Sequence, residues 1–431
     1  MQSIDTIFAL SSGALPSGVA LVRLSGPGTR NALEQLLGAV PEPRSAVYRS
    51  IRSRKGLILD RGLVLFFTAP RSFTGEDCAE LHLHGGRAVV ASVLAELALL
   101  PNLRHAEAGE FTKRAFLNGK LDLLEAEALG DLIQAETEAQ RRFAISNSSG
   151  MQSRLYEGWR GRLLHARAMI EAELDFADES DVPGSISDIV WRDMESLANE
   201  ICLHMAGFHR AEMIREGFRV VILGAPNAGK SSLLNALARR DVAIVTNEPG
   251  TTRDLIEVAL DLNGHKVVIT DTAGIREDAG NVESIGIERA RVAAQAADLV
   301  LLLVEPNGQV PDIDAAVRLR IATKTDLGSE EARADLAIST VTGVGIEELL
   351  DRIAAKAAMA ISAPDILPAR ARHMDLLART RDGILASLKS GGLELRAEEL
   401  RRAADELGRI SGRIDPEELL GAIFSNFCIG K

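Results

Sequence analysis

Residues 224–232 constrain the possible folds of this chain more than any other segment. They run Gly-Ala-Pro-Asn-Ala-Gly-Lys-Ser-Ser and follow an apolar stretch that begins at Phe218. Glycines at this spacing let the backbone wrap around a phosphate, and the N-terminus of a following helix favours the anion. An apolar strand, this turn and a helix in that order predict a phosphate-binding P-loop within a parallel α/β sheet.

The α/β pattern extends over residues 216–363, and different patterns lie on each side of it. Residues 1–118 mix short β-rich runs with turns and one helical stretch near residues 88–100, which predicts an α+β domain. Residues 119–215 and 364–431 have helical spacing, and amphipathic helices need a partner for their apolar faces. We therefore expect these two segments to form one all-α domain into which the α/β unit is inserted.

Composition limits the class of protein. With 431 residues, of which 46% are hydrophobic and 26% charged, the chain is expected to fold throughout as several domains. It has no apolar run of the ~20 residues needed to cross a bilayer and no signal-type N-terminus. The three widely spaced cysteines indicate neither a disulfide framework nor a zinc site. We expect a cytoplasmic protein without a membrane partner.

The charge distribution along the chain limits where a nucleic acid could bind. The net charge of −12 argues against broad capture of phosphates. Residues 364–431 contain 11 basic and 11 acidic residues, so any RNA contact is expected in this neutral segment. The basic run at residues 49–55 is interpreted as a solvated loop.

Motifs after the P-loop follow the order found in GTPases. Lys230 neutralises the β- and γ-phosphates, Ser231 and Thr252 supply hydroxyls to Mg²⁺, and Asp271 reaches the metal through water. The backbone N–H of Gly274 can meet the γ-phosphate. The complete predicted GTP-binding set is Gly224, Asn227, Ala228, Gly229, Lys230, Ser231, Ser232, Thr246, Thr251, Thr252, Asp271, Thr272, Ala273, Gly274, Thr323, Lys324, Asp326, Ser339 and Thr340.

The expected base is guanine. Residues 323–326, Thr-Lys-Thr-Asp, are similar to the Asn-Lys-x-Asp element of GTPases, and Asp326 can accept two hydrogen bonds that guanine offers and adenine does not. Thr323 departs from this pattern. Because a hydroxyl is shorter than a carboxamide, we expect weakened guanine affinity. Ser339 and Thr340 stand where GTPases have Ser-Ala.

The group that promotes hydrolysis is not the usual one. Ile275 follows Gly274, where Ras-like enzymes have a water-orienting glutamine. Asn227 and the polar stretch at residues 246–251 can together surround a monovalent cation that stabilises the transition state. Glu283 either orients the attacking water or simply solvates the start of a helix. The residues alone leave both roles of Glu283 open.

Motifs in all three regions occur in the order of one family. They include residues 72–77 (Ser-Phe-Thr-Gly-Glu-Asp), 84–86 (His-Gly-Gly), 109–111 (Gly-Glu-Phe), 114–118 (Arg-Ala-Phe-Leu-Asn), 250–254 (Gly-Thr-Thr-Arg-Asp) and 427–431 (Phe-Cys-Ile-Gly-Lys). On these motifs the chain resembles, from end to end, the MnmE (TrmE) family of tRNA-modification GTPases.

The resemblance implies two sets of site residues. K⁺ would bind at Asn227, Thr246, Glu248 and Thr251, and Glu283 would assist hydrolysis together with Lys230. The N-terminal domain would be folate-binding and would dimerise. Arg23, Glu80, Lys120 and Lys431 would hold 5,10-methylene- or 5-formyl-tetrahydrofolate. Cys428 is a further candidate in that site, with a structural role equally open.

The resemblance also implies a reaction. The family adds an aminomethyl or carboxymethylaminomethyl group to C5 of the wobble uridine (U34) of certain tRNAs, with the FAD-dependent partner MnmG. GTP hydrolysis would drive pairing of G domains and conformational switching. The alternatives are a GTP-dependent ribosome-assembly or RNA-binding switch without modification activity, and a structural switch with negligible hydrolysis.

Overall fold

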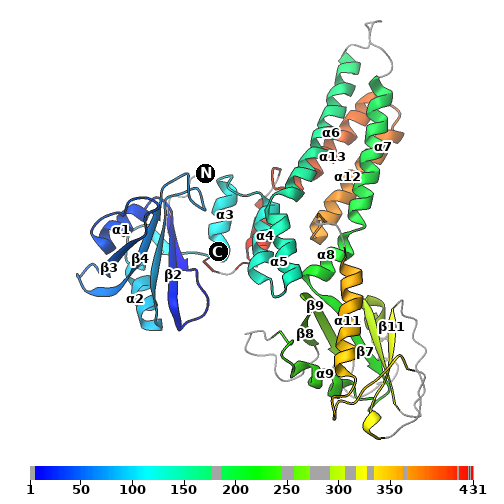
Figure 1. Cartoon of the computed structure of the whole chain (residues 1–431). Coiled ribbons are helices and arrows are strands. Elements are labelled where there is room, and N and C mark those ends of the chain that lie inside the picture. Colours follow the sequence, from blue (N-terminus) through cyan, green and yellow to red (C-terminus); the bar gives the residue numbers. More distant parts are fainter. Residues whose placement is uncertain are drawn as a thin grey trace, which may run out of the picture. The chain divides into compact units, whose positions relative to one another are not determined.

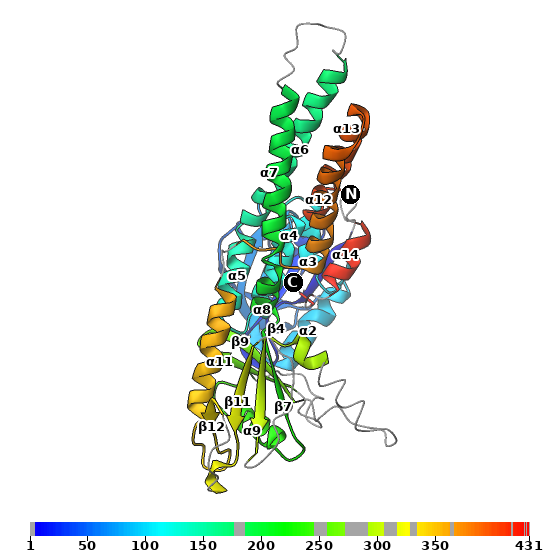
Figure 2. The ribbon, with the colours of Figure 1, turned by 90° about the vertical axis from the view of Figure 1, so that its right-hand side faces the viewer.

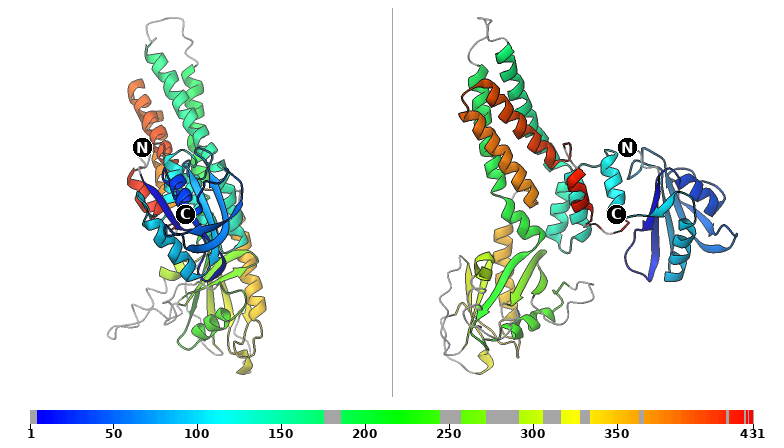
Figure 3. Two further views of the ribbon diagram at one scale, coloured as in Figure 1. Left: turned by 90° about the vertical axis from the view of Figure 1, so that its left-hand side faces the viewer. Right: turned by 180° about the vertical axis from the view of Figure 1, so that it is seen from behind.

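The chain forms two compact units. The computed structural model describes residues 5–175, 186–244, 257–271, 292–305, 317–327, 334–362, 366–414, 417–425, 427 and 429–430. The N-terminal unit comprises residues 1–130 and 407–431, and the central unit comprises residues 131–406. Figures 1, 2 and 3 show the ribbon from different sides.

A six-stranded sheet forms the body of the N-terminal unit (Figure 1). Its order is β3 (Val47–Arg52), β4 (Ile58–Phe67), β5 (Cys78–Gly85), β2 (Ser17–Ser25), β1 (Thr6–Leu10) and β6 (Leu103–His105). All neighbouring strands are antiparallel except β1 and β6. The inward-facing residues Val22, Phe66 and Leu81 form a core with helices α1 (Thr29–Leu37) and α2 (Arg87–Ala98). One face of this sheet is therefore buried beneath helices.

The end of the chain returns to this sheet. Helices α3 (Glu110–Leu117), α4 (Leu123–Gln134) and α14 (Glu417–Phe424) share a small apolar core. Gly109 has a φ of 66°, and a Cβ there would lie 2.5 Å from the carbonyl oxygen of Phe424, so this approach requires glycine. Beyond α14, Ile429 pairs with Ala108, and Ser11 Oγ donates to the carbonyl oxygen of Gly430 at 2.8 Å.

Two expectations for residues 1–118 are wrong in detail. Helices α1 and α3 were not predicted, although Ala32, Leu33 and Leu36 form a helical stripe that ends at Gly38 with a φ of 81°. The run at residues 49–55 is not a loop throughout, because Arg49 and Arg52 belong to the edge strand β3. Basic side chains on an edge strand disguise its β pattern while protecting it from edge-to-edge pairing.

The central unit contains the predicted α/β sheet. Its order is β12 (Leu336–Ala337), β11 (Arg318–Ala322), β10 (Leu299–Val304), β7 (Phe218–Gly224), β9 (His265–Asp271) and β8 (Glu257–Leu262). Only β8 pairs in the antiparallel sense. All six residues of β10 are buried, which is typical of a parallel strand covered on both faces. Helices α9 (Lys230–Ala238) and α11 (Ile346–Ile361) contribute to its core.

Long helices from both sides of this segment pack together, which confirms an all-α domain with an inserted α/β unit. They are α6 (Met151–Asp175), α7 (Ile186–Met205), α12 (Ala371–Lys389) and α13 (Leu393–Ile410). Figures 1 and 2 show α6 and α7 side by side. The guanidinium of Arg396 on α13 lies 4.4 Å from the ring centroid of Trp191 on α7. No described helix is both long and apolar enough to span a membrane.

The chain enters and leaves the α/β segment at one place. Arg215, at the end of α8 (Phe208–Arg215), donates to the carbonyl oxygen of Ala369 at 2.6 Å, and Gln140 of α5 (Glu138–Ser148) donates to the carbonyl oxygen of Arg215 at 2.8 Å. Phe143 of α5 and Ala369 belong to the same apolar core as the strands. The core of the sheet thus includes residues on both sides of the predicted segment 216–363.

Candidate functional site

The nucleotide-site residues gather at one edge of the central sheet. Strand β7 ends at Gly224, β9 at Asp271 and β11 at Ala322, and these strands run in the same direction. Ligands of open α/β sheets bind beyond the carboxyl ends of the strands. The predicted motifs that follow these three strands therefore meet at the edge where a ligand is expected.

The P-loop has the backbone that its sequence predicts. Asn227 and Gly229 have φ values of 67° and 90°, in the left-handed region, and α9 begins at Lys230. A Cβ on Gly224 would lie 2.8 Å from the carbonyl oxygen of Leu303, so glycine is needed there. Lys230 Nζ donates to the carbonyl oxygens of Gly224 and Ala225 at 2.9 and 3.0 Å. The ammonium group is thus held over the loop that would surround the phosphates.

The structure brings together two predicted metal-side residues that are distant in sequence. Ser231 Oγ donates to Asp271 Oδ2 at 2.7 Å, and Asp271 is buried. A hydroxyl beside a carboxylate provides the hard oxygen donors that Mg²⁺ prefers, and the metal usually keeps several of its waters. The chemistry of this pair fits a magnesium ion bound between the protein and nucleotide phosphates.

The base-recognition segment is tied to the P-loop. Thr323 is buried, and its hydroxyl donates to the carbonyl oxygen of Ala228 at 3.0 Å. Ser339 Oγ donates to Asp326 Oδ1 at 2.6 Å, and Lys324 Nζ lies 2.7 Å from Glu305 Oε1. The sequence did not predict the bond to Ala228, because its two residues lie 95 positions apart. Thr323 thus positions two loops relative to each other.

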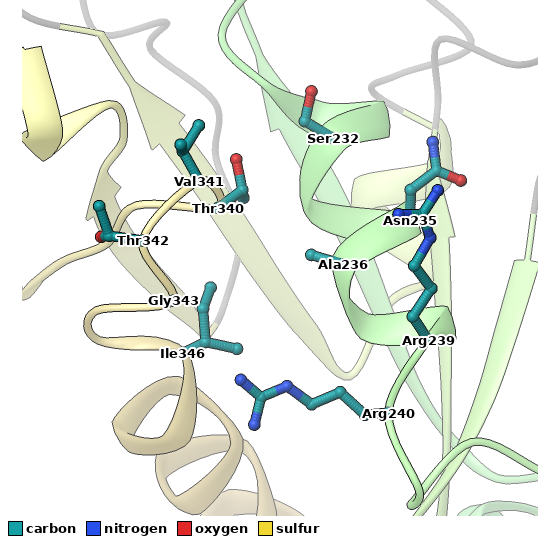
Figure 4. Close-up of a pocket in the computed structure, with 10 residues that line it drawn as sticks. All are labelled: Ser232, Asn235, Ala236, Arg239, Arg240, Thr340, Val341, Thr342, Gly343 and Ile346. Atoms are coloured by element: carbon teal, nitrogen blue, oxygen red, sulfur yellow. The ribbon is translucent and has the colours of Figure 1, made fainter.

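A cavity of about 530 Å³ lies between α9 and the loop that precedes α11. It is lined by Ser232, Asn235, Ala236, Arg239, Arg240, Thr340, Val341, Thr342, Gly343 and Ile346. Figure 4 shows Ser232 of α9 and Thr340 of the facing loop on opposite walls. Arg240 forms an ion pair with Glu347 at one end. The volume suits a small molecule, and two predicted GTP-binding residues line the cavity.

A second set of predicted residues lies in the N-terminal unit. Arg23 of β2 pairs with Glu80 of β5, with 3.0 Å between Nη2 and Oε1. The Arg23 guanidinium lies 5.7 Å from the ring centroid of Phe73 and 5.8 Å from that of Phe111. His82, which the sequence prediction did not include, places Nε2 3.7 Å from Glu80 Oε2. Arg23 and Glu80 are therefore brought together among aromatic rings.

Lys120 lies beside the loop that contains Phe73. A Cβ built on Gly75 of that loop would lie 3.4 Å from the side chain of Lys120. Lys120 also lines a cavity of about 480 Å³ that includes Asp122 and Arg413. One loop thus connects the Arg23–Glu80 pair to Lys120.

A buried ionic network supports this loop. The side chain of Arg114 is 6% exposed and lies within 3.1 Å of carboxylate oxygens of Asp5, Glu76 and Glu110. Burial alone would raise the pKa of Glu110, but hydrogen bonds donated by Arg104, by the amide of Glu107 and by Arg114 hold that pKa below its usual value. Apart from the Glu110–Arg114 pair within α3, these charges come from separate parts of the chain, so their pairing could not be predicted from sequence spacing.

Comparisons with known proteins agree along the whole chain. Family models described as GTP-binding protein TrmE N-terminus and MnmE helical domain match residues 6–120 and 123–428. A protein of Chelativorans sp. (strain BNC1) named tRNA modification GTPase MnmE is 61% identical, covering 99% of this chain and 98% of that protein. Proteins of the same name from Mesorhizobium japonicum and Rhizobium meliloti are 59% and 56% identical, covering 100% of both chains.

The chain belongs to the MnmE family of tRNA modification GTPases. The family resemblance deduced from the motifs is confirmed, and the chain is a GTP hydrolase of tRNA modification. The P-loop geometry accords with this activity. Among solved structures, the G domain of the T. maritima FeoB iron transporter is 24% identical, covers 32% of this chain and 98% of that chain, and has a TM-score of 0.24, too low for a comparison of folds.

Several residues predicted for an MnmE-type site lie outside the described residues. They are Thr246, Glu248, Thr251, Thr252, Thr272, Ala273, Gly274, Glu283, Cys428 and Lys431. Of the predicted potassium ligands, Asn227 is described and is exposed on the P-loop. The assignments of these residues remain predictions.

Proposed function

We propose that the chain is a potassium-stimulated GTPase that works with the flavin-dependent MnmG to add a (carboxymethyl)aminomethyl group to C5 of U34 in certain tRNAs. A tetrahydrofolate bound by the N-terminal unit donates the one-carbon unit. The observation that carries this proposal is the Arg23–Glu80 pair, which projects from adjacent strands beside Phe73. A charged pair among aromatic rings suits a flat, polar ring system such as a pteridine.

The residues of this pair fit folate chemically. Oε1 of Glu80 accepts from Arg23, and Oε2 has no hydrogen-bond donor among the described residues, since His82 Nε2 is 3.7 Å away. Oε2 is thus available to accept from the N–H groups of a pteridine. Lys120 and Lys431 would pair with the carboxylates of the glutamate tail. When bound, the folate supplies a one-carbon unit at the oxidation level of formaldehyde or formate.

On the nucleotide side, the residues orient GTP and stabilise charge. Lys230 neutralises phosphate charge, and Ser231 with Asp271 and Thr252 would hold Mg²⁺. The exposed carboxamide of Asn227 suits a K⁺ ion shared with Thr246, Glu248 and Thr251. The Glu283 carboxylate would then orient the attacking water in place of a glutamine. Pairing of two G domains around this site would switch the conformation of the helices.

A homodimer through the N-terminal unit and a cytoplasmic location complete the proposal. On the sheet face opposite α1 and α2, Val19 of β2 is 58% exposed, away from the outer strands β3 and β4. An apolar side chain on an uncovered sheet face favours contact with another protein surface. The proposed domain borders are residues 1–118, 119–215, 216–363 and 364–431.

The folate assignment is tested with Glu80→Gln, which keeps the shape of the side chain and removes its charge. Affinity for 5-formyl-tetrahydrofolate, measured by calorimetric titration, should fall at least tenfold, since a hydrogen bond to a charged group contributes roughly 1.5–3 kcal/mol. Glu34→Gln, an exposed residue of α1, is the matched control. Equal affinities in the two variants would place folate elsewhere or exclude it.

The cation and the modification are tested separately. GTP turnover should be much faster in potassium than in sodium buffer, and equal rates would remove the cation from the mechanism. Mass spectrometry of nucleosides from a strain without this protein should show the loss of modified wobble uridine. Unchanged wobble uridines would refute the modification role.

A further inference from the structure

A strongly basic surface lies on the N-terminal unit of this acidic chain. Residues 44–71 contain seven basic residues and one acidic residue, a local charge of +6 in a chain whose net charge is −12. All seven basic side chains are exposed. They are Arg44, Arg49, Arg52, Arg54, Lys55, Arg61 and Arg71, and we name this set the basic edge.

Carboxylates leave most of this charge uncompensated. Arg54 pairs with Glu96 at 3.0 Å, and in the part of the chain that the structure describes the other six form no ion pair. Asp60, the acidic residue of the segment, is bound to His84. The backbone N of His84 lies 2.8 Å from Asp60 Oδ2, and the ring Nδ1 lies 2.8 Å from Asp60 Oδ1. Elsewhere exposed arginines are commonly paired, as Arg401 is with Glu398 and Asp405. The basic edge is therefore a concentrated positive field.

The cations follow the outer strand pair of the sheet from end to end. Arg44 donates to the carbonyl oxygen of Arg71 at 2.6 Å, and this pair lies where β4 ends. Along β3, Ser50 is opposite Arg61 and Arg52 is opposite Ile58, so Arg61 and Arg52 lie close together. Since a strand rises ~3.3 Å per residue, the six residues of β3 alone span about 20 Å. This length accommodates several consecutive phosphates.

An aromatic side chain stands within this row. Tyr48 of β3 is opposite Leu63, next to the Ser50–Arg61 pair, and 62% of its surface is exposed. An exposed ring among arginines is the combination with which proteins stack unpaired bases and follow a nucleic-acid backbone. Two copies of the basic edge would repel each other across a twofold interface, which argues against a homodimer contact there.

We propose that the basic edge binds the phosphate backbone of tRNA and that Tyr48 stacks on an unpaired base. The proposal rests on the tRNA part of the proposed function and not on its folate or potassium parts. It replaces the expectation that RNA contacts lie in residues 364–431. There, arginines such as Arg379, Arg401 and Arg402 form ion pairs with neighbouring carboxylates.

The test measures binding of unmodified tRNA transcript to the full chain over a series of salt concentrations. The triple variant Arg49→Ala, Arg52→Ala, Arg61→Ala should bind at least tenfold more weakly. Its plot of log affinity against log salt should be shallower by about 2, because each phosphate contact contributes ~0.7–0.9 to the slope. The matched control is Arg379→Ala, Arg401→Ala, Arg402→Ala, which removes the same charge from exposed ion pairs.

Other readouts separate this surface from the rest of the protein. GTP turnover, folate affinity and melting temperature should be the same in both triple variants. Tyr48→Ala should weaken tRNA binding about fivefold or more and leave binding of inorganic polyphosphate unchanged.

Several outcomes would overturn the proposal. They are an unchanged affinity and slope in the first triple variant, an equal loss in the control, or a wild-type chain that does not bind tRNA. A basic-edge variant that dissociates the homodimer in sedimentation while still binding tRNA would assign the surface to protein contact instead. Failure of the folate or potassium tests would leave this result unaffected.

Discussion

The two six-stranded sheets of this chain form their candidate sites in opposite ways. In the mostly parallel central sheet, the site lies at the strand ends and consists of short loops of consecutive residues, such as the P-loop after β7. In the mostly antiparallel N-terminal sheet, the site lies on a face, where Arg23 meets a residue 57 positions away in sequence. The residues of a site on a loop are consecutive in sequence, whereas the residues of a site on a sheet face are brought together by the pairing of strands.

The two sites also differ in what holds them. The P-loop rests on an apolar core that continues through β7 and α9. The loop beside Arg23 is supported by the buried charges around Arg114. We therefore expect the N-terminal site to be sensitive to loss of a single charge and the central site to be sensitive to loss of a loop residue.

The largest effect is expected for Arg114→Ala. Removal of this cation leaves three carboxylates without their buried partner, and breaking a buried pair in this way costs about 3–5 kcal/mol. Chemical denaturation should show this loss of unfolding free energy for the N-terminal unit. In the control, Arg30→Ala, the lost ion pair with Asp77 is half-exposed and should contribute only about 0–1 kcal/mol. Equal losses of unfolding free energy in the two variants would show that the buried charges around Arg114 do not hold the N-terminal site.

The next largest effect is expected for Lys230→Ala. Loss of the ammonium group removes charge stabilisation from the phosphates, and single-turnover hydrolysis should slow by about 10²–10³-fold. Folding stability and folate affinity should not change, because the two sites lie on different sheets. Lys356→Ala, on α11 and away from the P-loop, is the matched control. A parallel loss of folate affinity would show that the sites are not independent.

The smallest effect is expected for Thr323→Asn. The longer carboxamide can reach guanine as well as the P-loop, so GTP should bind more tightly by about 1 kcal/mol. Thr323→Val removes only the bond to the carbonyl oxygen of Ala228 and should weaken binding of GTP and GDP alike. Nucleotide titrations would measure both changes. If the asparagine variant bound GTP no better than wild type, the missing carboxamide would not limit affinity.

The difference between the two sheets also explains how much of the structure could be predicted from the sequence. The strand that leads to Gly224, the turn and α9 were all predicted, because these residues are consecutive and their types report backbone shape directly. The Ser231–Asp271 contact followed from motif order in a parallel sheet. The P-loop and a mainly parallel sheet were therefore predicted from local patterns, whereas the antiparallel strand β8 and the Thr323–Ala228 bond were not.

The N-terminal sheet was predicted less fully. Its positive surface was overlooked because the basic run at residues 49–55 was interpreted as a loop, and only the pairing of β3 with β4 places Arg61 beside Arg52. The ionic network of Arg114 depends on side chains from three separate places in the chain: Asp5, Glu76 and helix α3. Long-range register of this kind is not encoded in the spacing of one segment, so no periodicity could reveal it.

The single entry and exit point of the inserted sheet has a practical consequence for dissecting this protein. Arg215, before the α/β segment, and Ala369, after it, are joined by one hydrogen bond. Cutting the chain before Arg215 and after Ala369 would therefore release the G domain as one polypeptide. A fragment that began at Phe218 would nevertheless leave Phe143 behind and uncover the apolar side of the sheet that this ring covers. Such a fragment would be prone to self-association, and turnover rates measured on it would not represent the intact enzyme.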